Sequence, residues 1–340
     1  WGECLSETMR LQEPRYNLPM VGRLAELEQA RSLLGRAVTG RGQILGLTAE
    51  AGMGKSRLAA EVIRLAGTMG LTVYGGECLS HAAQSSYLVW KPILRSVFGL
   101  DTSQSTEAQI TQLRAALAAM NPALLPRLPL LGQPLALPIP DNDTTRSMES
   151  QLRKTAFEDL VSAFLCHVSR RQPLLIVLED CHWIDPLSAD LLETVGRDLV
   201  TEKIMLLAVY RPPDEQRAAL TITRQAHFSE INLHEFSLAE TEQLIGYKLA
   251  QFGFDPAHIP PNLVARINER AQGNPFFVDE MVNWLHDRGI APDDSAALET
   301  LALPDSLYSL IISRIDQLED SARTTLKVAS VLGRSFRANW

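Results

Sequence analysis

The sequence predicts an α/β fold, an open parallel sheet with flanking helices, followed by an all-helical region. Two stretches, residues 173–178 and 204–209, are apolar at every position. Buried parallel strands have this composition because helices cover both faces of the sheet. Residues 44–48 form a third apolar run, and helical patterns separate the three runs. Strands that alternate with helices in this way indicate a doubly wound parallel sheet.

The remaining elements follow from periodicity and from breaking residues. Residues 71–74 are expected to form another strand. Helical periodicity is predicted before residue 233 over residues 23–38, 56–66, 87–99, 107–120 and 150–170, and after it, where the strand signal stops, over residues 238–251, 262–272, 276–288, 305–317 and 320–332. Residues 121–143 contain six prolines, which exclude regular helix, so an extended connection is expected there.

Length and composition restrict the class of protein. At roughly 100–200 residues per domain, 340 residues suggest two or three domains. Hydrophobic residues make up 46% of the chain and charged residues 21%, which is typical of a globular protein. The net charge of −8 argues against nucleic-acid binding by this segment, because proteins that contact phosphates present a basic surface.

The sequence also predicts where the protein is located. No apolar run reaches 18 residues, so no membrane association is expected. The first residues lack a basic stretch followed by an apolar run, so no signal peptide is expected either. Four scattered cysteines indicate reduced thiols in a cytoplasmic protein. Residues 1–19 are polar and turn-prone and are expected to be a linker, and both ends are expected to continue into a longer protein.

A glycine-rich turn joins the first strand to the next helix. The segment Ala49–Ser56 reads Ala-Glu-Ala-Gly-Met-Gly-Lys-Ser, which is a Walker A loop with alanine at its first glycine position. Gly52 and Gly54 can adopt positive φ, so that backbone N–H groups converge on phosphate oxygens. Lys55 is expected to reach the β- and γ-phosphates, and Ser56 to ligate Mg²⁺. The simpler alternative is a glycine turn that precedes a helix by chance, but strand, turn and helix together favour an α/β P-loop NTPase.

An acidic pair, Glu179 and Asp180, ends the apolar strand at residues 173–178. Phosphoryl transfer needs one carboxylate for the Mg²⁺ shell and often a second one that orients water. Both residues are therefore predicted to be catalytic and to hold the metal, as a Walker B strand does. The order Glu before Asp leaves their separate roles open, and two solvated acids at a strand end are the alternative.

Arg211 follows the strand at residues 204–209. Ligands of parallel sheets bind beyond the carboxyl ends of the strands, where an arginine can contact a γ-phosphate. Arg211 is thus a predicted sensor of phosphate, with an ordinary surface arginine as the alternative. For His182–Asp185, a catalytic histidine is weighed against a helix-entry motif in which Trp183 packs and Asp185 caps the helix, and the second interpretation is preferred.

Together these motifs resemble the AAA-like module of the STAND signal-transduction ATPases, which occurs in bacterial class III adenylate or guanylate cyclases and in large LuxR-type regulators. The resemblance covers the chain from about residue 19 to the end. The segments that carry it are residues 19–27, 50–58, 178–185, 208–212, 273–280, 303–307, 314–318 and 329–334.

The resemblance implies a domain organisation and a nucleotide site. Residues 20–233 would be the nucleotide-binding domain, 234–300 a helical lid, and 301–340 the start of a winged-helix domain. Val21, Gly22 and Arg23 would line the adenine side, and Pro275 of the Gly273-Asn274-Pro275 motif would pack near the base. The complete expected nucleotide-binding set is Val21, Gly22, Arg23, Ala51, Gly52, Met53, Gly54, Lys55, Ser56, Arg57 and Pro275.

The expected function is an ATP- or ADP-binding switch with Mg²⁺ and slow hydrolysis, fused to sensor and effector domains outside this chain. Nucleotide-dependent self-association is a possible consequence. Ala49 and the order of the acidic pair bear on the rate of hydrolysis. Two alternatives stay open: a fast oligomeric AAA-type motor, and a non-hydrolysing scaffold that nucleotide stabilises. No arginine finger for a neighbouring subunit is visible, which weighs against the motor, and Lys55 with the acidic pair weighs against the scaffold.

Overall fold

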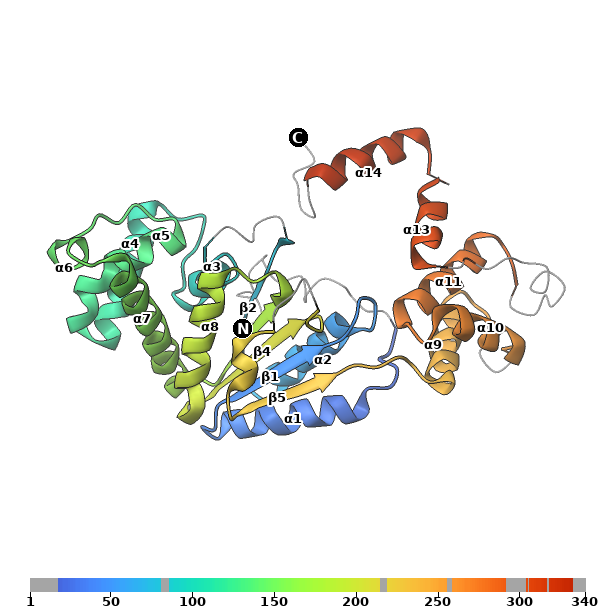
Figure 1. Ribbon diagram of the computed structural model, residues 1–340, viewed down its shortest axis with the longest axis horizontal. Coiled ribbons are helices and arrows are strands. Elements are labelled where there is room, and N and C mark those ends of the chain that lie inside the picture. Colours follow the sequence, from blue (N-terminus) through green and yellow to red (C-terminus); the bar gives the residue numbers. More distant parts are fainter. Residues whose placement is uncertain are drawn as a thin grey trace. The chain divides into compact units, whose positions relative to one another are not determined.

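The computed structural model describes residues 18–80, 86–214, 219–255, 259–291, 304, 306–316 and 318–332. The described chain forms two compact units (Figure 1). The first contains Arg23–Ala51 and Lys55–Leu233, and the second contains Gly52–Gly54, the residues up to Gly22 and those from His234 onward. Residues 1–17 of the predicted linker, and parts of residues 292–340, lie outside the described residues. The predicted domain limits remain predictions.

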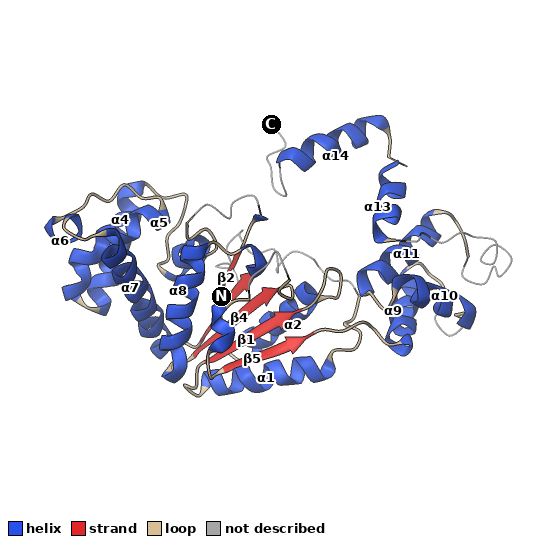
Figure 2. Cartoon of the chain, in the orientation of Figure 1, coloured by secondary structure: helices blue, strands red, loops and turns tan. Residues whose placement is uncertain are grey.

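A five-stranded parallel sheet forms the centre of the first unit. Its strands are β1 (Gln43–Thr48), β2 (Thr72–Glu77), β3 (Leu174–Glu179), β4 (Ile204–Tyr210) and β5 (Phe228–Asn232), in the order β2-β3-β4-β1-β5 (Figures 1 and 2). Every neighbouring pair is parallel. The structure confirms the predicted fold class and four predicted strands, and it adds β5, which the periodicity did not indicate.

Helices cover both faces of this sheet. On one face, alternate residues of β3 and β4 share a buried apolar cluster with α3 (Trp90–Val97), α4 (Thr106–Met120), α7 (Ser150–Arg171) and α8 (Pro186–Asp198). Helices α1 (Leu24–Val38) and α2 (Lys55–Thr68) pack against each other and against β1 and β4. Residues Ile44–Leu47 of β1 are therefore buried at every position, as the continuous apolar run predicted.

The proline-rich connection between α4 and α7 is not extended, so this prediction was wrong. It forms a 3₁₀ helix, η3 (Pro122–Leu131), followed by the short helices α5 (Gly132–Leu135) and α6 (Asp143–Arg146). Pro126 and Pro129 lie inside η3. The fixed φ of proline lies within the range of a 3₁₀ helix, and burial of the leucines between the prolines stabilises the turn.

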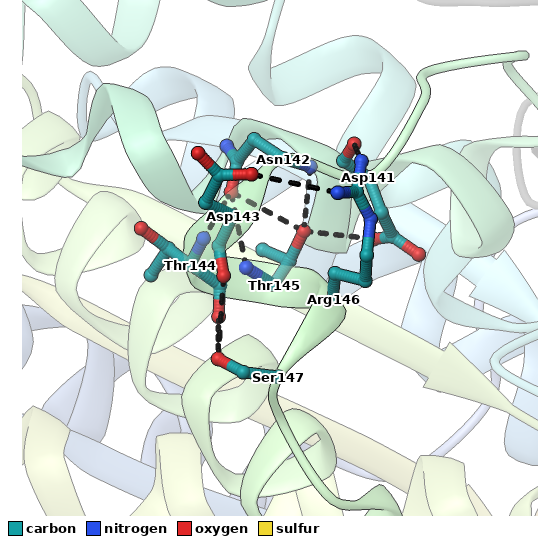
Figure 3. A network of polar contacts seen from close by, with 7 residues as sticks. All are labelled: Asp141, Asn142, Asp143, Thr144, Thr145, Arg146 and Ser147. Atoms are coloured by element: carbon teal, nitrogen blue, oxygen red, sulfur yellow. Dashed lines mark hydrogen bonds and ion pairs between the residues drawn. The ribbon is translucent and has the colours of Figure 1, made fainter.

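Polar contacts around α6 hold this connection in place (Figure 3). Asn142 and Thr145 form a reciprocal capping box at the start of α6. The Asn142 side chain also donates to the Pro126 carbonyl at 2.8 Å, and Arg153 of α7 pairs with Asp141 at 2.8 Å. The network is local and satisfies the backbone of a segment that lacks long helices.

The second unit is helical in all its described elements. It contains α9 (Leu238–Gln251), α10 (Pro261–Ala271), α11 (Pro275–Asp287), α13 (Leu307–Asp316) and α14 (Asp320–Leu332). Residues of α9, α10 and α11 form its apolar core. All five helices were predicted from periodicity. None of the helices in the described part of the chain is long and apolar enough to cross a membrane.

Candidate functional site

The glycine turn lies between β1 and α2, as the sequence predicted. Gly52 and Gly54 have φ values of 83° and 90°, in the left-handed region that favours glycine. A Cβ atom at Gly54 would meet no protein atom within 4 Å, so the conformation of the backbone, rather than packing, requires glycine there. Helix α2 begins at Lys55 and has no acidic residue in its first turn. Its partial positive charge is thus left for an anion at this end.

Lys55 folds back along the turn that precedes it. Its ammonium group donates to the carbonyl oxygens of Ala49 at 2.6 Å and Glu50 at 2.8 Å. The Lys55 pKa is lowered to about 8, mainly by burial and next by the positive charge of Arg211, while the negative charges of Asp180 and Glu50 act in the opposite direction. Lys55 is thus a partly buried ammonium group whose pKa responds to the charges of Arg211 and Asp180.

Strand order explains why these residues meet. Strand β4 lies between β1 and β3, and all three strands run parallel. The glycine turn follows β1, the acidic pair ends β3 and Arg211 follows β4, so the three segments lie at the same carboxyl edge of the sheet. This edge is where ligands of open α/β sheets bind. The structure therefore brings Lys55, Asp180 and Arg211 together, as predicted from their strands.

The backbone at the acidic pair is unusual. Glu179 is the last residue of β3, and its carbonyl accepts from Cys78 N–H at 2.9 Å. Asp180 has φ 52° and ψ 38°, a left-handed conformation that aspartate tolerates better than most residues do. Such backbones occur at functional sites, where the surrounding structure holds them in place. Directly after it, a 3₁₀ turn, η4 (Cys181–Trp183), leads toward α8.

The oxygen atoms available at this edge suit a hard cation. Ser56 is the second residue of α2, and it supplies a hydroxyl, while Glu179 and Asp180 supply carboxylates. Among the described residues, no group of three or more His, Cys, Asp or Glu side chains could hold a metal by itself. This donor set fits Mg²⁺, which takes one or two carboxylates and completes its shell with phosphate and water oxygens.

Several predicted nucleotide-binding residues lie in the second unit. Val21 is buried, and Gly22 has φ 61° and packs against the Glu240 side chain, so an added Cβ atom would clash. Pro275 is the first residue of α11, and the Asn274 side chain caps this helix by accepting from Phe276 N–H and Phe277 N–H. The base-side role of these residues remains a prediction.

One contact in the second unit was not predicted. The Phe276 N–H donates to the Gly52 carbonyl at 3.2 Å, and a Cβ atom at Gly52 would collide with the Asn274 side chain. The Gly273-Asn274-Pro275 motif therefore touches a glycine of the phosphate turn. The motif had been singled out in the sequence, but its partner could not be read from it.

Two other predicted residues make contacts along their own helices. Arg23 of the first unit is the N-cap of α1 and pairs with Glu26 at 3.3 Å, and Arg57 pairs with Glu61 at 3.4 Å. These ion pairs do not bear on nucleotide binding, so the nucleotide contacts of Arg23 and Arg57 remain predictions. Ala51 and Met53 belong to the glycine turn and are accessible to solvent.

For residues His182–Asp185, the structure confirms the prediction for Asp185 and contradicts the one for Trp183. Asp185 caps α8, since its Oδ1 atom accepts from Ser188 N–H at 2.9 Å. Trp183 is 41% exposed, so the prediction that it packs in the interior was wrong. The 3₁₀ turn directs Cys181 and the His182 side chain inward, and this leaves the third residue of the turn outside.

The sheet, the glycine turn before α2 and the acidic edge define a P-loop NTPase domain. Residues 19–207 match a family described as AAA ATPase domain, and the chain belongs to this family. Residues 242–296 match a domain of unknown function (DUF8739).

Individual relatives are distant. An uncharacterized protein of Rhizobium meliloti (strain 1021) is 25% identical over 331 residues, which cover 94% of this chain and 30% of that protein. The chain thus spans about 30% of the length of the curated relative that it matches. Among solved structures, Aeropyrum pernix ORC1 in complex with DNA has a TM-score of 0.44 at 15% identity, covering 96% of this chain and 76% of that one. Thermotoga maritima RuvB has a TM-score of 0.42 at 11% identity, covering 90% and 75%.

Proposed function

We propose that this chain binds ATP with Mg²⁺, hydrolyses it slowly and serves as a nucleotide-dependent switch in a larger signalling protein of the STAND class. One observation carries the proposal: Lys55, Asp180 and Arg211 lie at the same carboxyl edge of the sheet, because each follows a different one of the neighbouring parallel strands β1, β3 and β4. A lysine, a carboxylate and an arginine are the groups that phosphoryl transfer needs around a triphosphate. The membership in the AAA ATPase domain family supports the same chemistry.

Binding would begin at the glycine turn. The amide groups of residues 52–56 and the start of α2 would hold the β- and γ-phosphates. Lys55 would exchange its two carbonyl acceptors, Ala49 O and Glu50 O, for phosphate oxygens. The exchange replaces two neutral carbonyl acceptors by anionic phosphate oxygens, which attract the positive charge of Lys55 more strongly. The negative charge of the phosphates would also raise the depressed Lys55 pKa.

Hydrolysis would use the acidic pair and Arg211. Mg²⁺, when bound, would neutralise part of the negative charge of the phosphates. Ser56 and one carboxylate of the pair would hold the metal, and the other carboxylate would orient a water molecule and accept its proton. Arg211 would donate to the γ-phosphate and stabilise the charge that develops there.

The switch role rests on the part of the chain that follows the sheet. Strand β5 leads directly into the second unit, whose α11 begins at the Gly273-Asn274-Pro275 motif. A nucleotide can shift a conformational equilibrium only by binding its states with different affinity. The motif makes a backbone contact to Gly52, and it is the element through which ATP and ADP would favour different conformations. Sensor and effector domains, and self-association, would belong to the larger protein.

Turnover by the purified chain tests the proposal. The experiment measures Mg²⁺-dependent ATP hydrolysis and identifies the nucleotide that is released on denaturation. Tightly held ADP and turnover far below the enzymatic range of about 1–10³ per second would support a switch. Rapid turnover with little retained nucleotide would support the motor, and retained nucleotide without any turnover would support the scaffold.

A further inference from the structure

The residue Asp185 connects two segments that are far apart in the sequence. Its side chain is buried, with the residue 6% exposed. The Oδ1 atom accepts from Ser188 N–H at 2.9 Å, which caps α8, and from the backbone N–H of Tyr87 at 3.4 Å. Tyr87 lies 98 residues earlier, in the turn that precedes α3. A helix cap alone would not need this second contact.

A second bond joins the same two segments. Trp90 is the first residue of α3 and is fully buried, and its indole N–H donates to the Ser188 carbonyl at 3.0 Å. Tyr87 itself has φ 60°, which is strained for a tyrosine, and its ring packs edge-on against Phe157 of α7. The start of α8 is therefore held by α3, and the turn before α3 is held by α7.

The supported segment carries Asp180. Only four residues separate Asp180 from Asp185, and they form the η4 turn and its exit. The Asp180 carbonyl accepts from Trp183 N–H at 2.9 Å, and the Cys181 carbonyl accepts from Ile184 N–H at 3.1 Å. Strand β3 fixes one end of this short segment, and Asp185 fixes the other. The left-handed backbone of Asp180 is thus held from both sides.

We propose that Asp185 is a positioning residue, which keeps the backbone of Asp180, and with it the acidic pair, in the geometry for ATP hydrolysis. It does so through its two hydrogen bonds, one to the Tyr87 N–H and one to the start of α8. The inference rests on the proposed hydrolysis at the acidic pair. Asp185 acts as a hydrogen-bond acceptor in this role, and it transfers no proton. Its two backbone N–H donors already engage Oδ1.

The test separates the two bonds of Asp185. Asp185→Ser keeps a good helix cap, because serine and aspartate cap almost equally well. The shorter side chain cannot reach Tyr87 N–H while it caps Ser188. Asp185→Asn keeps the Oδ1 acceptor and both bonds but removes the charge. Ser105→Ala is the matched control, since it deletes the cap bond of α4 to Ala108 N–H, at 3.2 Å, in the same unit.

For each variant, kcat, the KM for ATP, the ATP dissociation constant and the thermal midpoint are measured. We expect Asp185→Ser to lower kcat by about 10- to 100-fold, the scale of a small misplacement of a reacting group, with ATP affinity within about twofold of the wild type. Asp185→Asn should keep kcat within about threefold of the wild type. Ser105→Ala should lower the thermal midpoint and leave kcat unchanged.

The outcomes distinguish this inference from the function on which it rests. Full kcat in Asp185→Ser, beside an active wild type, would overturn the positioning role and leave the ATPase proposal standing. An equal loss in Asp185→Asn would show that the charge matters, and it would replace positioning by direct acid–base catalysis. Absence of turnover in the wild type, with ATP still bound, would overturn the hydrolysis and this inference together.

Discussion

Tyr210 donates a hydrogen bond to the Glu230 side chain at 2.5 Å, across the strand that lies between them. Tyr210 ends β4, Glu230 lies in β5, and β1 separates the two strands. The tyrosine side chain crosses β1 at Gly46. Glycine is needed at this position because a Cβ atom there would lie 2.6 Å from the tyrosine hydroxyl oxygen. Burial and the Glu230 bond raise the Tyr210 pKa above its usual range. The bond links β4 to β5 close to the carboxyl end of β1, where the glycine turn begins, and Tyr210 directly precedes Arg211.

Gly46→Ala should therefore destabilise the first unit. The new methyl group would meet Tyr210 and Phe228, both at 2.6 Å, and overpacking of this kind costs about 1–3 kcal/mol. Urea unfolding of the chain measures the loss. The control is Gly35→Ala in α1, where the new Cβ atom would meet only the Met69 side chain at 3.9 Å, and where alanine favours the helix by about 1 kcal/mol. Equal stability of the two variants would contradict the account of Gly46.

Lys55→Ala should abolish ATP binding. The substitution removes the cation that would contact the phosphates. The free energy of unfolding should change little because, within the described part of the chain, the Lys55 ammonium donates to two carbonyls of its own turn. Isothermal titration with ATP and Mg²⁺ measures the affinity. Lys154→Ala is the control: it removes a lysine that pairs with Asp190 at 2.6 Å, and it should leave ATP affinity unchanged. Unaltered affinity in Lys55→Ala would refute the phosphate-binding role of the turn.

ATP affinity should also fall as the pH rises through 8. The Lys55 pKa is lowered to about 8, so the ammonium form that phosphates need is present below this pH and is lost above it. If only that form binds tightly, the dissociation constant rises about eightfold between pH 7.5 and pH 9, as titration of one such group requires. Titrations at constant ionic strength test this. Because Arg211 contributes to the lowering, Arg211→Gln should shift the fall in affinity to higher pH.

A flat affinity profile up to pH 9.5 would show that Lys55 keeps its proton or does not contact the phosphates. The two explanations separate in the Lys55→Ala variant. Loss of binding there with a flat wild-type profile would mean that the lysine binds phosphate and that its pKa lies higher. If ATP affinity in Arg211→Gln falls at the same pH as in the wild type, the arginine lies too far from Lys55 to affect its pKa.

Much of the sheet and of the candidate site could be predicted because continuous apolar runs and edge residues are local signals. The runs in β1, β3 and β4 identify buried parallel strands, and the rule for strand ends then brings Lys55, Asp180 and Arg211 together. Strand β5 was not predicted because it lies at the edge of the sheet, and its apolar residues are interrupted by Ser229, Glu230 and Asn232.

Other features depend on contacts between distant segments. Nothing near Asp185 in the sequence identifies Tyr87 as its partner, and nothing near Gly46 indicates the path of Tyr210. The exposure of Trp183 follows from the left-handed turn at Asp180, which composition does not reveal. The 3₁₀ helix at Pro122–Leu131 was not predicted because six prolines exclude a regular α-helix, and composition does not distinguish a 3₁₀ helix from the extended connection that was expected.

Pro275→Ala should alter the preference for ATP over GTP if the Gly273-Asn274-Pro275 motif contacts the base. Proline fixes the first turn of α11, and alanine there would keep the helix but remove the ring. Competition of ATP and GTP for binding measures the preference. We expect kcat for ATP to stay within about threefold of the wild type, which is a change of less than about 1 kcal/mol in the activation free energy, because the substitution leaves the proposed phosphate-binding and catalytic residues in place. Loss of phosphate affinity with an unchanged preference would instead favour a role through Gly52, which α11 contacts.

The acidic pair should divide into two roles when its members are changed separately. Glu179→Gln and Asp180→Asn keep the shape of each side chain and remove its charge. The residue that orients water should lower kcat by about 10²–10⁴-fold on substitution and leave ATP binding intact, since general acid–base catalysis contributes a factor of this size. The residue that holds the metal should instead raise the Mg²⁺ concentration needed for half-maximal turnover. Single-turnover hydrolysis across a Mg²⁺ titration separates these effects. If neither variant changes turnover or Mg²⁺ dependence, the carboxylates at the end of β3 have no part in hydrolysis.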